Sequence, residues 1–124
     1  MKKIFFIKSA TIDISRYNIK DIPGSSGRLD VISRCILSAL IDNNDLEKDI
    51  QIWVFLDNYG TYIFDSNSFN NDHFPKSEIL LADSFVDLIK KKINREGYPE
   101  TLGSVEKSKL NIIDAIKKFV KKKI

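Results

Sequence analysis

The chain has 124 residues, of which 43% are hydrophobic and 30% are charged. This length and composition fit one water-soluble domain, here 1–124, and exclude a disordered chain. No apolar run approaches the roughly 18 residues of a spanning helix, and the first residues lack the apolar core of a secretion signal, so we expect a cytoplasmic protein outside the membrane. A single cysteine, Cys35, and a single histidine, His73, exclude an internal disulfide and predict no metal site.

Positive charge is concentrated in the last third of the chain. Residues 1–89 carry nine Lys and Arg against thirteen Asp and Glu, whereas residues 90–124 carry eleven against four. Such a cluster can attract RNA through counterion release, or it can simply keep a small domain soluble, and composition does not choose between the two. The basic patch near the C-terminus consists of Lys117, Lys118, Lys121, Lys122 and Lys123.

The first half of the chain predicts a βαβ unit. The short apolar run 4–7 is typical of a strand covered on both faces, and 50–56 repeats this pattern. Between them, apolar residues recur at three- and four-residue steps over 28–41, which predicts a buried helix and hence parallel flanking strands. The turn 58–60 then favours a hairpin strand over 61–64.

The second half predicts helices packed on this sheet. Residues 65–75 are polar and rich in turn formers, so we expect an exposed loop there. A helix is expected from a cap at Ser77 to about residue 93, ended by the glycine-bearing segment 95–99. A basic C-terminal helix is expected to open at Ser104 and to fill most of 104–124.

One turn is unusual because it places two glycines and two serines just before a helix N-terminus. Unpaired N–H groups in such a turn could bind an anion such as phosphate. The segment matches neither the dinucleotide fingerprint nor the P-loop. The alternative is purely structural: Pro23 and Gly24 form a turn, Ser26 or Gly27 caps the helix, and Asp30 complements the helix dipole.

The charged residues of the following helix also allow two interpretations. Asp30 and Arg34 are four residues apart with the acid first, which favours an intrahelical ion pair. Alternatively, Arg28 and Arg34 present their guanidinium groups to a phosphate backbone or to a partner subunit.

The run Asp21-Ile22-Pro23-Gly24-Ser25-Ser26-Gly27-Arg28-Leu29-Asp30-Val31, followed by Arg34-Cys35, resembles the N-terminal signature of the archaeal tRNA pseudouridine N1-methyltransferases. These are knotted, S-adenosylmethionine-dependent RNA methyltransferases of the SPOUT superfamily. The resemblance covers about 1–95 and implies a small SPOUT or Rossmann-like α/β fold with a parallel sheet and flanking helices. At 75–78 the chain has Pro-Lys-Ser-Glu where the family has a Pro-Asp-Glu-Arg-like element. The chain lacks the family's Gly-Asp-His segment, so the complete trefoil knot is not expected.

The resemblance implies methyl transfer from S-adenosylmethionine to the ring nitrogen of a pseudouridine in the tRNA T-loop, by an enzyme that acts as a homodimer. No residue of this chain matches the family's cofactor-binding motifs. Three explanations stay open: a truncated or degenerate member, half of a split enzyme completed by a C-terminal-half chain, or a non-catalytic RNA-binding or protein-interaction module. The positions that carry over to an RNA or dimer surface are Gly24, Ser25, Gly27, Arg28, Asp30 and Arg34.

Overall fold

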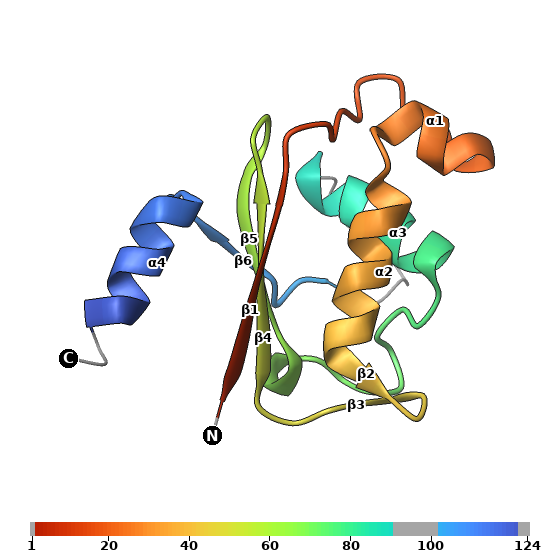
Figure 1. The fold of residues 1–124 in the computed structure, drawn as a ribbon. Helices are drawn as coiled ribbons and strands as arrows, with labels where there is room; N and C mark the ends of the chain where they lie inside the picture. Colours follow the sequence, from red (N-terminus) through yellow and green to blue (C-terminus); the bar gives the residue numbers. More distant parts are fainter. Residues whose placement is uncertain (1, 91–101, 122–124) are drawn as a thin grey trace.

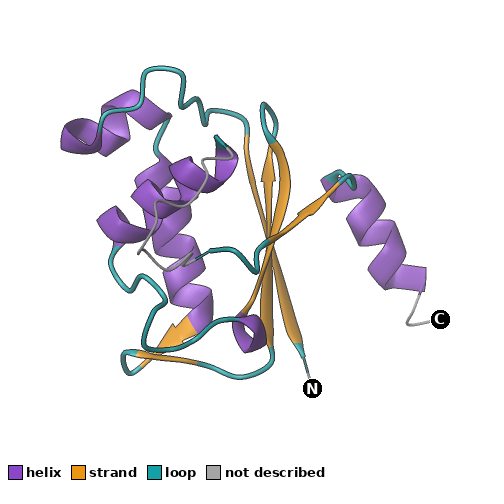
Figure 2. Ribbon diagram, turned by 180° about the vertical axis from the view of Figure 1, so that it is seen from behind, coloured by secondary structure: helices purple, strands orange, loops and turns teal. Residues whose placement is uncertain are grey.

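A four-stranded sheet separates two unequal layers of helices (Figure 1). The structure is a computed structural model that describes residues 2–90 and 102–121. Helices α1, α2 and α3 lie on one side of the sheet, and α4 lies alone on the other (Figure 2). The strands are β1 (Lys3–Ser9), β4 (Ile50–Leu56), β5 (Gly60–Asp65) and β6 (Glu106–Ser108), with a small separate pair β2 (Ile41–Asp42) and β3 (Asp45–Leu46); the helices are α1 (Ile22–Ser26), α2 (Leu29–Leu40), α3 (Glu78–Ile89) and α4 (Ile112–Lys121).

The predicted βαβ unit is confirmed. Strands β1 and β4 are parallel, with Phe5 opposite Ile52, and α2 forms the crossover between them. The predicted hairpin strand over 61–64 is also confirmed, as β5, which pairs antiparallel with β4. Strand β6 pairs antiparallel with β5, so the whole sheet is not parallel. The α/β class therefore holds, with a mixed sheet in place of the expected parallel one.

Apolar residues of β4 serve two cores. Ile52 and Val54 point into the main core under α2 and α3, whereas Trp53 and Phe55 belong to a smaller cluster that α4 covers. This explains the apolar run 52–56 of β4, since both faces of this part of the strand are buried. The same expectation is wrong for β1. This strand forms the edge of the sheet, and Phe5 is 44% exposed.

The C-terminal region differs from its prediction. The expected helix does not open at Ser104; residues 102–104 form a turn and β6 follows. Helix α4 begins at Ile112, where the Asn111 side chain accepts a hydrogen bond from the Asp114 N–H at 2.8 Å and so performs the capping expected of Ser104. The element missed is a three-residue polar strand, too short to leave a periodic pattern.

Helix α3 confirms its predicted start. The Ser77 hydroxyl accepts a hydrogen bond from the Leu80 N–H at 3.1 Å, and the helix follows at once. Its expected end near residue 93 and the segment 95–99 lie outside the described residues. The preceding segment 65–75 is not simply an exposed loop, because Phe74 is buried in the main core. Neither residues 2–90 nor residues 102–121 contain a helix with the length and hydropathy needed to cross a bilayer.

Candidate nucleic-acid interface

The glycine- and serine-rich turn lies where β1 and β4 end (Figure 1). After Ser9 the chain crosses over this end of the sheet, buries Ile12 and Ile14 in the main core, and enters α1 and then α2. In α/β proteins the carboxyl ends of parallel strands are the usual place for a ligand. The sequence motif and the favoured edge of the fold therefore coincide.

Two consecutive residues of the turn have left-handed backbone conformations. Gly27 has φ of 67° and Arg28 has φ of 72°, and together they reverse the chain between α1 and α2. A Cβ atom on residue 27 would lie 1.8 Å from the carbonyl oxygen of Thr11. Residue 27 must therefore be glycine, both for its conformation and for the close approach of the 11–14 segment.

Protein groups already satisfy the turn's N–H groups. The Ser26 hydroxyl accepts a hydrogen bond from the Leu29 N–H at 3.0 Å, and the Asp21 carboxylate accepts one from the Gly24 N–H at 3.2 Å. The N–H groups of Gly27 and Arg28 both donate to the Pro23 carbonyl. The predicted cap at Ser26 or Gly27 is wrong, because the N-cap residue of α2 is Arg28, whose side chain makes no capping bond; Ser26, the last residue of α1, serves only the first N–H of α2. Together these bonds leave no free phosphate cradle at these positions.

Ser25 also acts within the turn. Its hydroxyl donates to the Asp21 carbonyl at 2.6 Å and accepts from the Asn18 N–H at 2.8 Å. This residue therefore ties the loop before α1 to the helix itself. Of the small residues in the motif, Gly24 is the one that lies exposed.

Arg28 and Asp30 form a two-pronged ion pair. The Nε and Nη2 atoms of Arg28 donate to the two Asp30 carboxylate oxygens, both at 3.1 Å. Burial raises the pKa of Asp30. The hydrogen bonds and charge of Arg28 lower it by more, with help from the N–H groups of Val31 and Asp30, so this pKa lies below its ordinary value. The Asp30 side chain is 14% exposed and that of Arg28 is 60% exposed, so the guanidinium reaches solvent.

Arg34 binds a different acid from the one predicted. Its Nε atom donates to Glu78 of α3 at 2.7 Å, and its Nη2 atom reaches the other oxygen of the same carboxylate at 3.4 Å. The expected Asp30–Arg34 pair is wrong because Asp30 is taken by Arg28 and Glu78 offers both oxygens to Arg34. The pair links α2 to the start of α3, and the Arg34 side chain remains 58% exposed.

The two groups of residues predicted to contact RNA lie on opposite sides of the sheet. The turn and α2 are on one side, whereas α4, which contains Lys117 and Lys118, is on the other (Figure 2). The Lys118 ammonium lies 5.8 Å from the centre of the Trp53 ring. The Lys121 side chain, Lys122 and Lys123 lie outside the described part of the chain.

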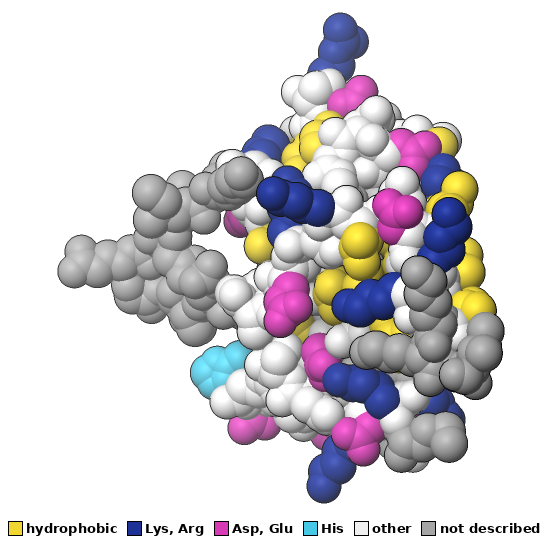
Figure 3. All heavy atoms as spheres, turned by 90° about the vertical axis from the view of Figure 1, so that its left-hand side faces the viewer, with side chains coloured by type: hydrophobic (Ala, Val, Ile, Leu, Met, Phe, Trp, Pro, Cys, Tyr) yellow, Lys and Arg dark blue, Asp and Glu magenta, His cyan; other side chains and the backbone are white. Residues whose placement is uncertain are grey.

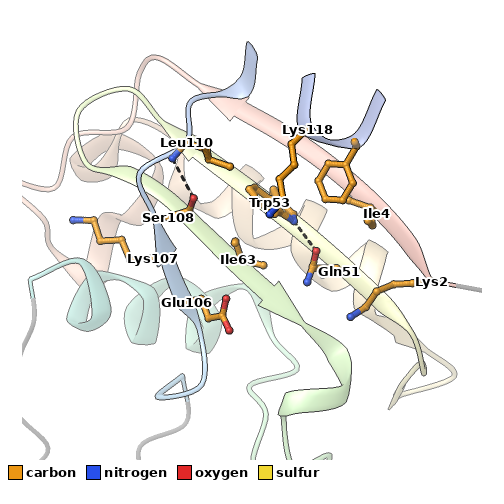
Figure 4. A pocket seen from close by; sticks show the side chains of 11 residues that line it. Lys2, Ile4, Gln51, Trp53, Ile63, Glu106, Lys107, Ser108, Leu110 and Lys118 are labelled. Carbon is orange, nitrogen blue, oxygen red and sulfur yellow. Dashed lines mark hydrogen bonds between the residues drawn. The ribbon is translucent and has the colours of Figure 1, made fainter. Parts of the chain in front are cut away.

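Sequence reasoning missed a hollow of about 510 Å³ on the α4 side of the sheet (Figure 4). Its floor is Trp53, whose indole N–H donates to Gln51 at 2.7 Å, and Ile63. Lys118 overhangs one side, and Lys2 lies at the other. The polar Gln51 within an otherwise apolar strand was the only signal in the sequence that one end of this face is uncovered.

The fold and the turn define a small α/β protein built on a βαβ unit. The family model described as "Putative SAM-dependent RNA methyltransferase" matches residues 1–96. The chain therefore belongs to this family, and the resemblance inferred from the signature turn is confirmed. The family is described as S-adenosylmethionine-dependent.

Individual relatives match a shorter region. A tRNA (pseudouridine(54)-N(1))-methyltransferase from Methanocaldococcus jannaschii is 38% identical over 56 residues, which are 45% of this chain and 27% of that protein. The protein of the same name from Methanococcus maripaludis is 45% identical over 40% of this chain. The one from Methanococcoides burtonii is 34% identical over 45% of this chain. These matches span only 25% and 28% of those relatives, about a quarter of their length.

The described residues do not fit S-adenosylmethionine. At the carboxyl ends of β1 and β4, Lys8 pairs with Asp57 at 3.0 Å, and the Asn58 side chain donates to the Ile12 carbonyl at 3.1 Å. Protein groups at the edge where the parallel strands end are thus bonded to one another. The hollow beneath α4 is lined by Lys2, Lys107 and Lys118 against one acid, Glu106, and such a lining repels the sulfonium cation of the cofactor.

Proposed function

We propose that this chain is the tRNA-recognising part of a methyltransferase that modifies pseudouridine at its N1 nitrogen in the T-loop. The supporting observation is the family match, which contains the whole signature turn. In this proposal the turn and the start of α2 face the RNA. Polypeptide outside the described residues, as in a split enzyme, binds the cofactor and completes methyl transfer.

The geometry of Arg28 and Arg34 supports contact with phosphates. Each guanidinium spends two of its five N–H groups on a carboxylate and keeps its Nη1 group for another acceptor. Because each is held by an ion pair and is more than half exposed, little side-chain entropy is lost when a phosphate binds. Each arginine charge is offset by the carboxylate that it binds, so little net positive charge remains on this surface. We therefore expect this surface alone to bind RNA weakly and in a salt-sensitive way.

The chain's role in catalysis would be to position the substrate base. The T-loop nitrogen has to be held in line with the methyl donor, and a rigid turn that grips the RNA backbone contributes to that alignment. Gly27 and the hydrogen bonds of Ser25 and Ser26 provide this rigidity.

A binding and activity assay tests the proposal. The full chain is titrated into a fluorescent T-arm hairpin containing pseudouridine, with a hairpin of unrelated sequence as the control, over a series of salt concentrations. We expect preference for the T-arm and an affinity that falls with salt. Methyl transfer from labelled S-adenosylmethionine is then measured with the chain alone and with the cofactor-binding half of a family member added. Equal affinity for both hairpins, together with no methyl transfer in either mixture, would refute the proposal.

A non-catalytic RNA-binding module is the second candidate, because the described residues offer no fit for the cofactor. It predicts the same preference for the T-arm, with no methyl transfer in the presence of the second half. Methyl transfer in the mixture separates the two candidates, since only the split enzyme is expected to methylate the hairpin when the second half is added.

A further inference from the structure

The hollow beneath α4 is bordered by two charged side chains that have no ion-pair partner among the described residues (Figure 4). Lys118 belongs to α4, and its ammonium lies 5.8 Å from the centre of the Trp53 ring. Glu106 belongs to β6 and faces the α4 side of the sheet, since it pairs with Ile63, a member of the cluster that α4 covers. Lys118 and Glu106 are both exposed. Each is therefore free to bind a ligand.

The other two lysines around the hollow are already engaged. The Lys2 ammonium pairs with Asp65 at 2.5 Å. The Lys107 ammonium lies 5.7 Å from the centre of the Tyr62 ring, which is buried in the main core on the other side of the sheet. Three lysines and one glutamate line the hollow, so the lining as a whole still favours an anionic ligand. Lys118 is the cation that can contact such an anion directly.

Sheet geometry sets the distance between the two free charges. Trp53 of β4, Ile63 of β5 and Glu106 of β6 lie opposite one another across three strands. Neighbouring strands are about 4.8 Å apart, so the backbone of Glu106 lies about 10 Å from that of Trp53. Because Lys118 lies over Trp53, a ligand that contacts both charges has to span a comparable distance. A mononucleotide has such a span between its phosphate and the far edge of its base.

Apolar side chains form the surface between the two charges. Ile63 lies in the floor of the hollow, and Leu110 is part of its lining (Figure 4). The polar Gln51 is already engaged, because it accepts from the Trp53 indole N–H at 2.7 Å and donates to Asp65 at 3.3 Å. Figure 3 shows this face of the molecule, where hydrophobic side chains reach the surface between basic and acidic ones. The volume of about 510 Å³ is typical of a small-molecule site, and the apolar floor suits the flat face of a base.

We propose that this hollow binds a guanine mononucleotide, with its phosphate at Lys118 and its base on Ile63. The edge of guanine carries two adjacent donors, the ring N1–H and the 2-amino group. The Glu106 carboxylate is an acceptor with two oxygens, so it can receive both. Adenine and cytosine instead place a ring acceptor beside their amino group, and that acceptor repels a carboxylate. Glu106 therefore selects guanine, and Lys118 selects its phosphate.

The charges of the hollow suit this ligand. The phosphate is attracted by Lys118, whereas the neutral base brings no second anion toward Glu106. Neither side chain has to leave an ion pair within residues 2–90 and 102–121 when the nucleotide binds. Because both residues are exposed, each contact contributes modestly, and we expect a Kd between about 0.1 and 1 mM.

Calorimetric titration of the full chain with guanosine 5′-monophosphate (GMP) tests the proposal. Three further ligands separate the contacts. Guanosine lacks the phosphate, inosine 5′-monophosphate lacks the 2-amino group, and adenosine 5′-monophosphate lacks the paired donors. Each of them should bind at least about threefold more weakly than GMP.

Substitutions assign the contacts to residues. Lys118→Gln should lower the affinity for GMP about fivefold and leave the affinity for guanosine unchanged. Glu106→Gln should abolish the preference for GMP over inosine 5′-monophosphate. Lys117→Gln is the matched control, since Lys117 is also an exposed lysine of α4 but does not line the hollow, and it should bind GMP as the wild type does. Trp53 fluorescence is a second readout: GMP should change the emission of the wild type and not that of Lys118→Gln, because the phosphate draws the ammonium from the ring.

Four results would overturn the proposal. They are no binding at about 5 mM GMP, equal affinity for GMP and guanosine, equal affinity for GMP and inosine 5′-monophosphate, and equal losses in the Lys117 and Lys118 variants. A short single-stranded RNA containing guanine is the remaining arm. If it binds this hollow more tightly than GMP, the ligand is an RNA strand and the assignment to a free nucleotide is wrong. Neither T-arm binding nor methyl transfer is measured, so the outcome is independent of the proposed function.

Discussion

Replacing Gly27 with alanine tests whether the signature turn depends on close backbone contact. Alanine at φ of 67° costs about 1 kcal/mol from its conformation. The new Cβ would also lie 1.8 Å from the Thr11 carbonyl oxygen, so the 11–14 segment has to move away. That movement breaks the Thr11 hydroxyl to Gly27 carbonyl bond at 3.0 Å and the Asp13 N–H to Ser26 carbonyl bond at 3.1 Å, each worth about 1 kcal/mol.

The expected loss in free energy of unfolding is therefore about 3 kcal/mol. Urea unfolding followed by the fluorescence of Trp53, the one tryptophan of the chain and a buried residue, gives this value. Gly60→Ala is the matched control. Gly60 also has positive φ, but its Cβ would meet the flexible end of the Lys107 side chain, so we expect a loss of about 1 kcal/mol. If both substitutions cost the same, the close contact with Thr11 does not stabilise the turn.

Three further predictions concern the helices around the turn. Ser33→Ala should raise the free energy of unfolding by about 1 kcal/mol in the same urea assay, because the buried Ser33 hydroxyl has no hydrogen-bond partner among residues 2–90 and 102–121; a loss of stability would contradict this. A double-mutant cycle of Arg34→Gln and Glu78→Gln should give a coupling below about 1 kcal/mol, since both side chains are exposed; a larger coupling would mean that the pair governs how α2 and α3 pack. In the folded state the pKa of Asp30 is held below its ordinary value of 3.8. As the pH falls, Asp30 is therefore protonated in the unfolded state before it is protonated in the folded state. The stability that this carboxylate contributes above pH 4 is lost as the pH falls further. Acid titration of Asp30→Asn should show a shallower loss below pH 4 than the wild type, and an identical profile would contradict the assignment.

The elements that the sequence predicts well are those with a periodic pattern or a local cap. The helix over 28–41, the strand over 50–56 and the cap at Ser77 each depend on residues close together in the chain. For these features local chemistry and the final fold agree. The cap expected at Ser26 or Gly27 was wrong, since Arg28 is the N-cap residue of α2 and Ser26 reaches only the Leu29 N–H from the end of α1.

The features that the sequence could not predict depend on distant residues. Whether β1 lies inside the sheet or at its edge depends on which strands reach it, and nothing within β1 records this. Arg34 binds Glu78, which is 44 residues away, in preference to the acid on its own helix. Strand β6 exists only because β5 offers it a partner. Each of these outcomes is fixed by tertiary packing.

The central claim is that the α2 side of the sheet, with its signature turn, is the surface that recognises tRNA. The most direct measurement compares T-arm binding by two charge-neutralised variants, each with two substitutions: Arg28→Gln with Arg34→Gln on one side of the sheet, and Lys117→Gln with Lys118→Gln on the other. We predict that the arginine variant loses at least tenfold in affinity. The slope of log affinity against log salt concentration should also fall by about one to two, which corresponds to the loss of one or two phosphate contacts. The lysine variant should stay close to the wild type. The reverse result, or an arginine variant that binds as tightly as the wild type, would contradict the claim.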